Sequence, residues 1–254
     1  MGAQMPTPER IVAVVVAYNR AQLLTENLTA LTNQTHPLDA IVVINNASTD
    51  TTEQVATHFP AVSETITLPR NTGGAGGFAA GIARAVHHWN ASLVWIMDDD
   101  TVPTPTALSE LLRAREQYPG QPALLASKAV WIDGTEHPMN RPRSRPLLSA
   151  RLAAHAHAIN ALPIRTASFV SILIDARAVH AEGLPLAAYF LWNDDFEYTS
   201  RLLKNRIGLY VPASVVVHKT AKFGNSTANP GPRFTNEVRN KLWAFRYSHG
   251  LYPV

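Results

Sequence analysis

Two apolar runs, each followed by a helical pattern, constrain the fold of this chain most strongly. Residues Ile11 to Val16 form a nearly unbroken β-branched run without alternation, which is typical of a strand buried on both faces of a parallel sheet. Leucines at helical spacing follow it, and the run from Ile41 to Ile44 repeats the arrangement. Since two strand–helix units stand within about 60 residues, we predict an α/β sheet with right-handed crossovers and with ligands at the carboxyl ends of its strands.

The composition limits the class of protein. The 254 residues are 46% hydrophobic, which suffices for one large core, so we expect a flexible N-terminus at residues 1–10 and a single domain over residues 11–254. A formal net charge of only +3 does not indicate a nucleic-acid partner. The absence of cysteine excludes disulfides, thiolate catalysis and cysteine-bound zinc. The longest apolar stretch, Ile11 to Ala17, is too short to span a bilayer and has no signal-peptide pattern.

Polar and glycine-rich turns follow the first predicted strands. Asn19 with Gln22 suggests a helix N-cap with its reciprocal third residue. Further on, Gly73 to Gly77 lead into a third helix, where glycines let backbone N–H groups approach an anion. The stretch from Gly74 to Ala79 also fits the dinucleotide pattern G-x-G-x-x-A, but that pattern belongs after the first strand of a sheet. A dinucleotide-dependent oxidoreductase is therefore a remote alternative.

An acidic triplet, Asp98 to Asp100, ends the apolar run that begins at Leu93. Three adjacent carboxylates at the end of a buried strand repel one another, and a hard divalent ion such as Mg²⁺ or Mn²⁺ would compensate them. Alternatively, the triplet is a solvated strand end before Thr101 to Pro105, which would lead into a helix. His218, at the end of the predicted strand from Val215, is a candidate third ligand. Alternatively, it lies at the surface or is hydrogen-bonded within the protein, as histidines at strand ends more often are.

A second acidic cluster lies beside an aromatic residue. Trp192 is followed by Asp194, Asp195 and Glu197, which lead into an amphipathic helix. Alternatively, these acids have a structural role, in which Asp194 caps the helix and Glu197 stands at the third position of its first turn. An aromatic face beside carboxylates also suits a sugar, because the ring stacks on C–H groups while an acid accepts a hydroxyl proton.

The second half of the chain is less regular. Residues 119–165 are rich in proline and arginine, most of all at Arg141 to Pro146, and indicate a solvated loop, with a lid or a phosphate contact as the alternative. A buried strand is predicted from Ala167 to Ile174 and a short helix from Arg177 to Glu182, and the segment from Thr220 to Pro232 is predicted to be mobile.

A last helix presents one apolar face, which we expect to complete the core. Alternatively, this face contacts a membrane surface or a partner subunit. That face contains Val238, Leu242 and Phe245.

Taken together, the ordered motifs resemble the GT-A-fold inverting glycosyltransferases of family 2, over nearly the whole chain. The motifs that carry the resemblance are Val15 to Arg20, Val43 to Asp50, Arg70 to Phe78, Met97 to Asp100, Trp192 to Tyr198 and Val217–His218. The stretch from Asn71 to Gly74 and the acidic triplet look most like the branch of rhamnosyltransferases and galactofuranosyltransferases, and in particular like the initiating galactofuranosyltransferases of mycobacterial-type arabinogalactan. The resemblance implies a GT-A fold, a Rossmann-like nucleotide-binding α/β sandwich with a mixed central sheet. A nucleotide-sugar-binding half would span residues 11–118, and an acceptor-binding half with the C-terminal helix would span residues 119–254.

The resemblance also assigns roles to individual residues. It implies that Asp195 is the catalytic base, and that a Mn²⁺ or Mg²⁺ ion is held by Asp98, Asp100 and His218. Many relatives have Asp at the position expected to recognise uracil, where this chain has Asn45. The acceptor-binding residues would be Trp192, Asp194 and Glu197, and the nucleotide-sugar-binding residues Ala17, Tyr18, Arg20, Asn45, Asn46, Arg70, Asn71, Gly73, Asp98, Asp99 and Arg239.

The reaction implied is transfer of galactofuranose from UDP-galactofuranose to a polyprenyl-diphosphate-linked cell-wall acceptor, with inversion at the anomeric carbon. A rhamnosyltransferase that uses dTDP-rhamnose, a nucleotidylyltransferase and a nucleotide-sugar-binding module without catalysis remain alternatives. A cytoplasmic location is implied, and peripheral contact with the cytoplasmic face of the membrane and homo-oligomerisation are left open.

Overall fold

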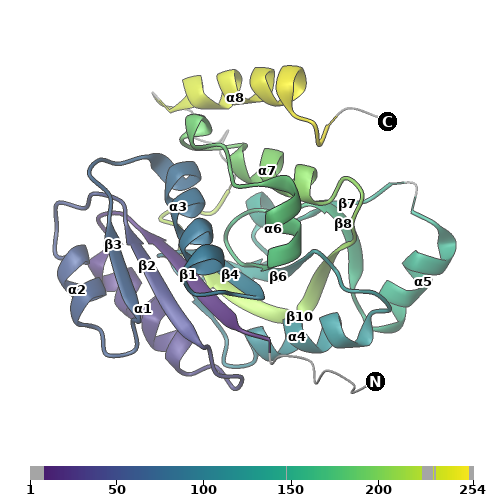
Figure 1. The fold of residues 1–254 in the computed structure, drawn as a ribbon, viewed down its shortest axis with the longest axis horizontal. Coiled ribbons are helices and arrows are strands. Elements are labelled where there is room, and N and C mark those ends of the chain that lie inside the picture. Colours follow the sequence, from purple (N-terminus) through teal and green to yellow (C-terminus); the bar gives the residue numbers. More distant parts are fainter. Residues whose placement is uncertain (1–8, 147, 225–230, 232, 252–254) are drawn as a thin grey trace, which may run out of the picture.

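A ten-stranded mixed sheet forms the centre of the computed structural model, which describes residues 9–146, 148–224, 231 and 233–251 (Figure 1). Its strand order is β3-β2-β1-β4-β9-β6-β10-β8-β7, and β5 pairs separately with β10. The strands are β1 (Ile11–Ala17), β2 (Ala40–Asn45), β3 (Glu64–Thr67), β4 (Leu93–Asp98), β5 (Thr101–Pro103), β6 (Leu124–Val130), β7 (Arg143–Ser144), β8 (Leu162–Thr166), β9 (Ile172–Asp175) and β10 (Gly208–His218). The helices are α1 (Ala21–Thr32), α2 (Thr52–His58), α3 (Gly73–His87), α4 (Ala107–Gln117), α5 (Ala150–Ala158), α6 (Ala176–Glu182), α7 (Asp194–Leu202) and α8 (Phe234–Tyr247), with 3₁₀ turns η1 (Pro138–Asn140) and η2 (Ala187–Tyr189).

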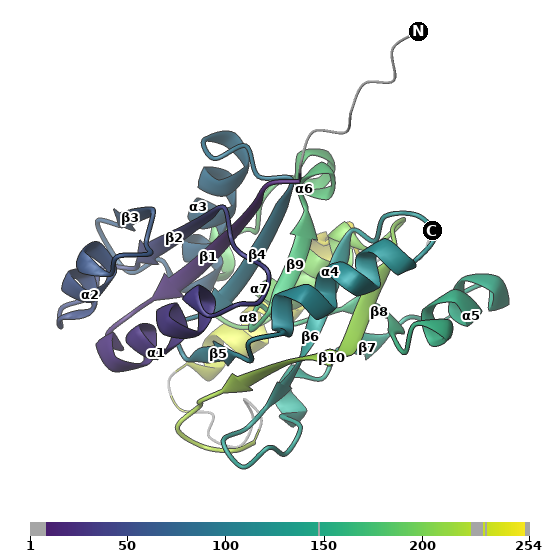
Figure 2. The same cartoon turned by 90° about the horizontal axis from the view of Figure 1, so that it is seen from below.

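Strand β1 is buried on both faces, as its continuous apolar sequence predicts. Val12 and Val14 pack in the same cluster as Phe78 of α3, whereas Ala13 and Val15 pack in the cluster that contains Leu24 of α1. Figure 2 shows α1 and α4 on the face of the sheet that is seen from below. β1 pairs in parallel with β2 on one side and with β4 on the other, so the predicted parallel α/β arrangement is confirmed.

The chain order reverses between β1 and β4, and this reversal positions the site. β2 and β3 extend the sheet on one side of β1, and β4 returns to the other side. Val16 is the register partner of Asp98, so the carboxyl ends of the two strands lie together. Clefts in open α/β sheets form at such switch points. On the far side of β4 the sheet becomes mixed, because β9 runs antiparallel to β4 and β6.

Strand β10 brings the late histidine to the acidic triplet. His218 is the antiparallel partner of Thr101 in β5, and the N–H of Lys219 donates to the carbonyl of Asp100 at 2.8 Å. Residues Thr101 to Pro105 therefore do not simply lead into a helix, since the first three form β5 and α4 begins at Ala107. The pairing of β5 with β10 is a long-range contact that the local sequence does not reveal.

Three other sequence predictions need correction. Residues 119–165 are not a solvated loop, because they contain β6, η1, β7, α5 and most of β8. The strand predicted from Ala167 covers only Ile172–Asp175, and the residues before it line a cavity. Asn19 does not cap α1: its φ is +52°, its Oδ1 accepts from the N–H of Thr49 at 2.7 Å, and Arg20 occupies the N-cap position.

The predicted C-terminal helix exists, but its apolar face does not complete the core. Val238, Leu242 and Phe245 of α8 are 48%, 63% and 76% exposed. The helix instead buries Asn240 and Ala244, because the amide of Asn240 is bonded to the turn beneath it. Within the described part of the chain, no helix is long and apolar enough to cross a membrane.

Two predictions of flexibility fall largely outside the described residues. Residues 1–8 are not described, while Glu9 forms an ion pair with Arg115 and the N–H of Arg10 donates to Ser92. Residues 225–230 and 232 of the predicted mobile segment are likewise not described.

Candidate active site

A cavity of about 1050 Å³ opens at the carboxyl ends of β1, β4 and β10. Both acidic clusters from the sequence reach it, although the two clusters are separated by almost 100 residues of chain. The predicted site residues that line it are Arg20, Asp98, Asp100, Trp192, Asp194, Asp195 and His218. The fold therefore brings together the predicted metal ligands and the predicted proton-transfer residues.

The ends of β4 and β10 form a cluster that fits a divalent cation. One ligand atom each from Asp98, Asp100 and His218 lies within 4.8 Å of the others, and His218 Nε2 is 3.3 Å from Asp100 Oδ1. That buried Asp100 Oδ1 has no hydrogen-bond partner among the described residues, as expected for an atom whose partner is a metal ion. Two carboxylates and one imidazole suit Mn²⁺ well and Mg²⁺ acceptably.

The charges in this cluster are strongly coupled. Burial, reinforced by the charges of Asp100 and Asp99, raises the pKa of Asp98 well above its usual value. Burial would also raise the pKa of Asp100, but His218 and Arg20 outweigh it and hold this pKa below its usual value. A cation bound between them would replace mutual repulsion by attraction.

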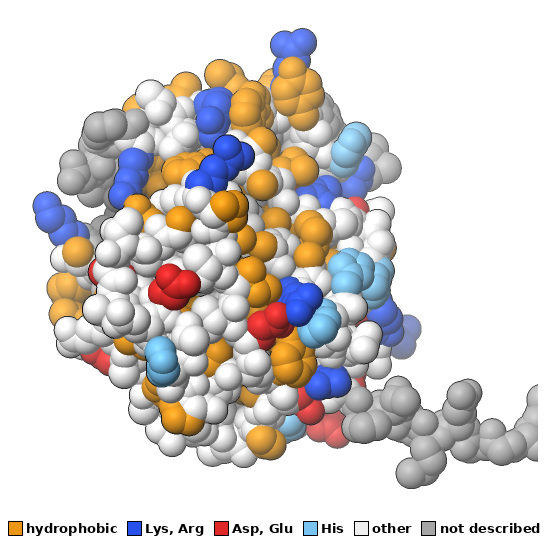
Figure 3. Space-filling model, turned by 60° about the vertical axis from the view of Figure 1, so that its left-hand side comes forward, with side chains coloured by type: hydrophobic (Ala, Val, Ile, Leu, Met, Phe, Trp, Pro, Cys, Tyr) orange, Lys and Arg blue, Asp and Glu red, His pale blue; other side chains and the backbone are white. Residues whose placement is uncertain are grey.

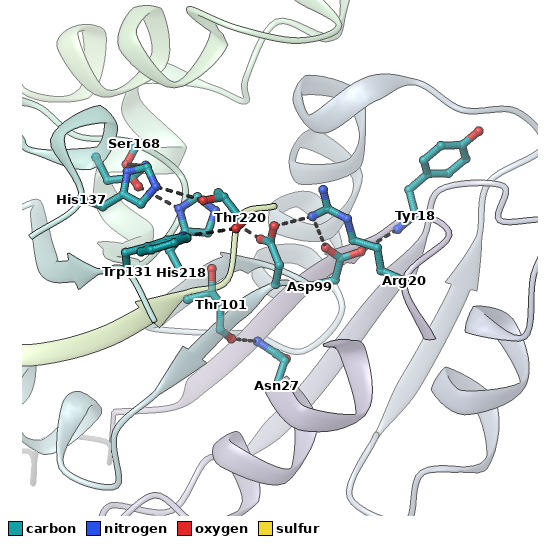
Figure 4. A network of polar contacts seen from close by, with 12 residues as sticks. Tyr18, Arg20, Asn27, Asp99, Thr101, Trp131, His137, Ser168, His218 and Thr220 are labelled. Atoms are coloured by element: carbon teal, nitrogen blue, oxygen red, sulfur yellow. Dashed lines mark hydrogen bonds and ion pairs between the residues drawn. The ribbon is translucent and has the colours of Figure 1, made fainter. Parts of the chain in front are cut away.

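Asp99 points away from this cluster, toward the turn after β1. Its Oδ2 accepts from the N–H of Tyr18 at 2.9 Å, and its Oδ1 accepts from Arg20 Nη1 at 3.1 Å (Figure 4). The same Nη1 lies 2.5 Å from Asp100 Oδ2, so Arg20 bridges two acids of the triplet. Burial raises the pKa of Asp99 to about 6, although Arg20 opposes this shift. The side chain of Tyr18 is 41% exposed and points away from the acids, as Figure 4 shows.

The predicted nucleotide-binding turns lie side by side and bond to one another. Asn46 Oδ1 accepts from the N–H of Thr72, and its Nδ2 donates to the carbonyl of Gly73. Asn45 Oδ1 accepts from the N–H of Ser48, and Asn71 Oδ1 from the N–H of Gly73. Ala17 is fully buried, so only its backbone can contribute, whereas Arg70 is exposed. The contacts of these residues with a nucleotide remain predictions.

Close packing requires glycines at two positions of α3, in addition to the predicted role of these glycines in binding an anion. Gly73 has φ +70°, and a Cβ there would lie 1.9 Å from the carbonyl oxygen of Phe190. A Cβ on Gly77 would lie 2.5 Å from Val16, so this glycine allows α3 to approach β1. Since α3 follows the edge strand β3 and not the first strand, the G-x-G-x-x-A match is not a dinucleotide fingerprint.

The turn before α7 holds the second acidic cluster in a strained backbone. Phe190, Trp192 and Asn193 all have positive φ, between +61° and +68°. Such conformations persist only where the surroundings enforce them, and they concentrate at functional sites. Here Asn240 of α8 enforces them, because its Nδ2 lies 2.7–2.9 Å from the carbonyl oxygens of Tyr189, Leu191 and Trp192.

Two residues predicted to bind ligands hold this turn and its helix instead of lining the cavity. Arg239 donates to the carbonyl of Tyr189 at 2.9 Å and lies over the ring of Trp243. Glu197 is buried and pairs with Arg201 at 3.0 Å, and neither Arg239 nor Glu197 is among the cavity-lining residues. Asp194 does not cap α7, since Asn193 occupies the N-cap position without a side-chain cap bond. The predicted ligand contacts of Arg239 and Glu197 stay predictions.

Asp194 and Asp195 have environments that separate their protonation states. Burial, together with the charge of Asp195, raises the pKa of Asp194 to about 8. Burial raises the pKa of Asp195 to about 6, and the hydrogen bond from the N–H of Phe196 and, to a smaller extent, the charge of Arg143 limit the rise. At neutral pH the pair therefore provides one carboxyl that can donate a hydrogen bond and one carboxylate that can accept a proton, which is a typical acid–base arrangement.

Two arginines of the cavity, Arg141 and Arg143, belong to the basic run for which a phosphate contact was the alternative to a loop. Other cavity residues were not predicted from the sequence. They include Asn140, Ser168 between β8 and β9, Lys222 after β10, and Arg233 and Lys241 at the start of α8 and within it.

Known proteins were compared with the chain at both the sequence and the structural level. The model of the family described as glycosyl transferase family 2 matches residues 12–152. Galactofuranosyltransferase GlfT1 of Mycolicibacterium smegmatis is 30% identical over 210 residues, which cover 79% of this chain and 68% of that protein. GlfT1 of Mycobacterium tuberculosis is 29% identical over 205 residues, which cover 78% of this chain and 66% of that protein. The chain thus spans about two thirds of the length of these relatives.

Solved structures show the same fold at lower identity. The structure of S. aureus TarS 1-349 in complex with UDP has a TM-score of 0.66 and 16% identity, and the match covers 94% of this chain and 66% of that one. GalNAc-T7 with UDP, GalNAc and Mn²⁺ has a TM-score of 0.67 and 14% identity, covering 91% of this chain and 48% of that one. These similarities confirm the predicted GT-A fold.

Proposed function

Since the chain belongs to glycosyl transferase family 2 and is a glycosyltransferase, we propose that it transfers galactofuranose from UDP-galactofuranose to a lipid-linked cell-wall glycan acceptor. The observation that carries the proposal is the meeting of the Asp98, Asp100 and His218 cluster with the Asp194–Asp195 pair in one cavity. The galactofuranosyltransferase relatives support the choice of sugar. A rhamnosyltransferase that uses dTDP-rhamnose is the second candidate.

On the donor side, the cluster of Asp98, Asp100 and His218 would hold a Mn²⁺ or Mg²⁺ ion. Such an ion supplies positive charge that stabilises the diphosphate as it leaves. Arg20, which lines the cavity and contacts Asp100, adds a second positive charge at the same place. The turns at Asn45, Asn46 and Asn71 would then contact the nucleoside.

On the acceptor side, the Asp194–Asp195 pair performs the proton transfer. Asp195 accepts the proton of the attacking hydroxyl group, and Asp194 donates a hydrogen bond that orients the acceptor. The hydroxyl oxygen attacks the anomeric carbon from the face opposite the leaving nucleoside diphosphate, so the configuration inverts. The C–H face of the sugar would stack on Trp192, which lines the cavity.

The charge distribution around the cavity favours an anionic acceptor. Acids at the end of β4 and at the start of α7 line one part of the cavity, while basic residues from three other segments line another. Arg143 stacks on Phe196 with 4.9 Å between its guanidinium carbon and the ring centre, so it is held beside Asp195. A phosphate-bearing acceptor would find complementary charge there. The basic residues are Arg141, Arg143, Lys222, Arg233 and Lys241.

Donor specificity provides the direct test. Product formation would be measured by mass spectrometry with a polyprenyl-diphosphate-linked acceptor, using UDP-galactofuranose, UDP-GlcNAc and dTDP-rhamnose, each with and without Mn²⁺. We expect transfer from UDP-galactofuranose that depends on the metal. Transfer from dTDP-rhamnose alone would favour the second candidate, and UDP binding without any turnover would contradict an enzymatic role.

We further propose that α8 contacts an anionic membrane surface beside the cavity. Val238 and Leu242 are exposed on a helix whose Lys241 also lines the cavity, and Figure 3 shows hydrophobic and basic side chains next to one another at the top of the molecule, where α8 lies. An apolar stripe flanked by Arg and Lys is the pattern of a helix that lies in a membrane interface. A lipid-linked acceptor would then enter the cavity without leaving the bilayer.

Replacing Leu242 by glutamate (Leu242→Glu) should weaken binding to vesicles with anionic lipid by about tenfold or more, because it puts a charge in the apolar face. Cosedimentation with phosphatidylglycerol vesicles would measure the effect. The matched control is Leu162→Glu, since Leu162 of β8 is 42% exposed but lies outside α8. Equal effects of the two substitutions, or dimerisation through α8 in solution without vesicle binding, would contradict a membrane contact.

A further inference from the structure

We propose that Asn140 is a positioning residue that holds His218 in the tautomer and orientation required to bind a cation, and that it thereby sets the preference of the site for Mn²⁺ over Mg²⁺. The inference rests on the metal site of the proposed function and assigns a role to a residue in the segment that the sequence presented as a loop. Asn140 is the last residue of η1, and its side chain is buried.

The hydrogen bonds of Asn140 define which atom faces the histidine. Its Nδ2 donates to Ser168 Oγ at 3.1 Å, which turns its Oδ1 toward the ring of His218. That Oδ1 lies 2.8 Å from His218 Nδ1. Because an amide oxygen only accepts hydrogen bonds, Nδ1 must carry the proton. Nε2 is then the ring nitrogen left for a cation, and it lies 3.3 Å from Asp100 Oδ1.

A second group of contacts restrains the plane of the imidazole. The ring of His137 lies against that of His218, with 5.3 Å between centres and 44° between planes. His137 is itself held, because its Nε2 lies 3.0 Å from Thr220 Oγ1 and the carbonyl of Thr220 accepts from Trp131 Nε1 (Figure 4). His218 is therefore bonded along one edge by Asn140 and packed on one side by His137.

This arrangement matters more for Mn²⁺ than for Mg²⁺. Mg²⁺ prefers oxygen ligands and keeps several waters, whereas Mn²⁺ binds imidazole more readily. Groups that hydrogen-bond the second nitrogen of a ligating histidine typically contribute about 10–100-fold to metal affinity. Loss of the bond from Asn140 should therefore reduce Mn²⁺ affinity strongly and Mg²⁺ affinity only slightly.

The experiment compares the Kd values of Mn²⁺ and Mg²⁺ by isothermal titration calorimetry in saturating UDP. In Asn140→Leu, which has a side chain of similar size but no acceptor, we expect Mn²⁺ to bind about 10–100-fold more weakly and the Mg²⁺ Kd to change much less. In Asn140→Asp, which keeps an acceptor for the Nδ1 proton, Mn²⁺ should bind at least as tightly as in the wild type. Asn33→Leu, at the exposed end of α1, is the control for the substitution itself.

Each other outcome points to a different error. If Asn140→Leu weakened the binding of Mn²⁺ and of Mg²⁺ equally, the effect would be a general structural one and the proposal would be overturned. Equal loss of Mn²⁺ binding in Asn140→Asp and in Asn140→Leu would also overturn it. The melting temperature without metal identifies a variant that does not fold, and in that case Asn140→Asp alone decides. If the wild-type protein binds no Mn²⁺ yet transfers sugar, the metal site fails while the glycosyltransferase assignment stands.

Discussion

Replacing Asp195 by asparagine (Asp195→Asn) is expected to reduce sugar transfer by about 10²–10⁴-fold while the affinity for UDP changes little. The amide has the size of the carboxylate but cannot take the proton of the acceptor hydroxyl group. Asp195 lies in the first turn of α7, whereas the predicted nucleotide-binding turns follow β1, β2 and β3. Product formation at saturating donor and calorimetric titration with UDP would separate the two effects.

The neighbouring acid provides the matched control for this prediction. Burial raises the pKa of Asp194 to about 8, so this carboxyl is protonated at pH 7 and an amide imitates it. Asp194→Asn should therefore cost much less activity than Asp195→Asn. Equal losses in the two variants, or a loss of UDP affinity as large as the loss of rate in Asp195→Asn, would contradict the assignment of the base.

The same assignment gives a pH dependence. Burial raises the pKa of Asp195 to about 6, and a general base must be ionised, so kcat/KM should rise as the pH increases through about 6. Above about pH 8, Asp194 loses the proton with which it donates to the acceptor, so the rate should fall again. Because the two carboxyl groups interact, the two apparent pKa values of the pH–rate profile describe the pair and not each residue separately. A profile without the rise near pH 6 would contradict the role of Asp195.

Replacing Asp98 by asparagine (Asp98→Asn) should remove metal-dependent stabilisation and at the same time stabilise the metal-free protein. The folded-state pKa of Asp98 is raised, so this residue favours folding only when it is protonated, and that contribution is lost as the pH rises through the raised pKa. At neutral pH without metal, Asp98 therefore costs folding free energy relative to a neutral side chain. An amide at this position avoids that cost and should increase the melting temperature by about 2–4 °C for each kcal/mol that is relieved.

Thermal-shift measurements with and without Mn²⁺ would test this prediction. Mn²⁺ at about 100 times its Kd should stabilise the wild-type protein by roughly 2.7 kcal/mol, and Asp98→Asn should lose that stabilisation. Asp99→Asn is the control, because Asp99 bonds to Tyr18 and Arg20 and is not one of the three clustered ligands. The metal site would be wrong if Mn²⁺ stabilised Asp98→Asn as much as the wild type.

Local sequence patterns predicted much of the first half of the fold. The apolar run in β1 requires burial on both faces, and the sheet provides it through α3 and α1. The acidic triplet begins with the last residue of β4, so its position at the carboxyl end of a strand follows from the strand alone. Both features depend on residues that are close in the chain, and this is why sequence patterns reveal them.

The second half could not be predicted in the same way. Segment 119–165 contains strands whose pairing partners lie far away in the chain, such as β6 with β10, and its proline and arginine content concealed them. The exposed stripe of α8 has the same spacing as a buried one, and the bonds from Asn240 and Arg239 to the strained turn decide which side faces the protein. Periodicity identifies a helix but does not determine which of its faces is buried.

For the site, the sequence by itself determined the types of residue available: an acidic triplet, a second acid pair beside Trp192, and a histidine at the end of a strand. Only the tertiary structure decided how they act together. It separated Asp99 from its neighbours by bonding it to Tyr18 and Arg20, and it placed Asn140 against the imidazole of His218. The physical reason is that protonation state, tautomer and side-chain direction depend on burial and on partners 80 or so residues away in the chain, such as Asp99 for Tyr18 or Asn140 for His218.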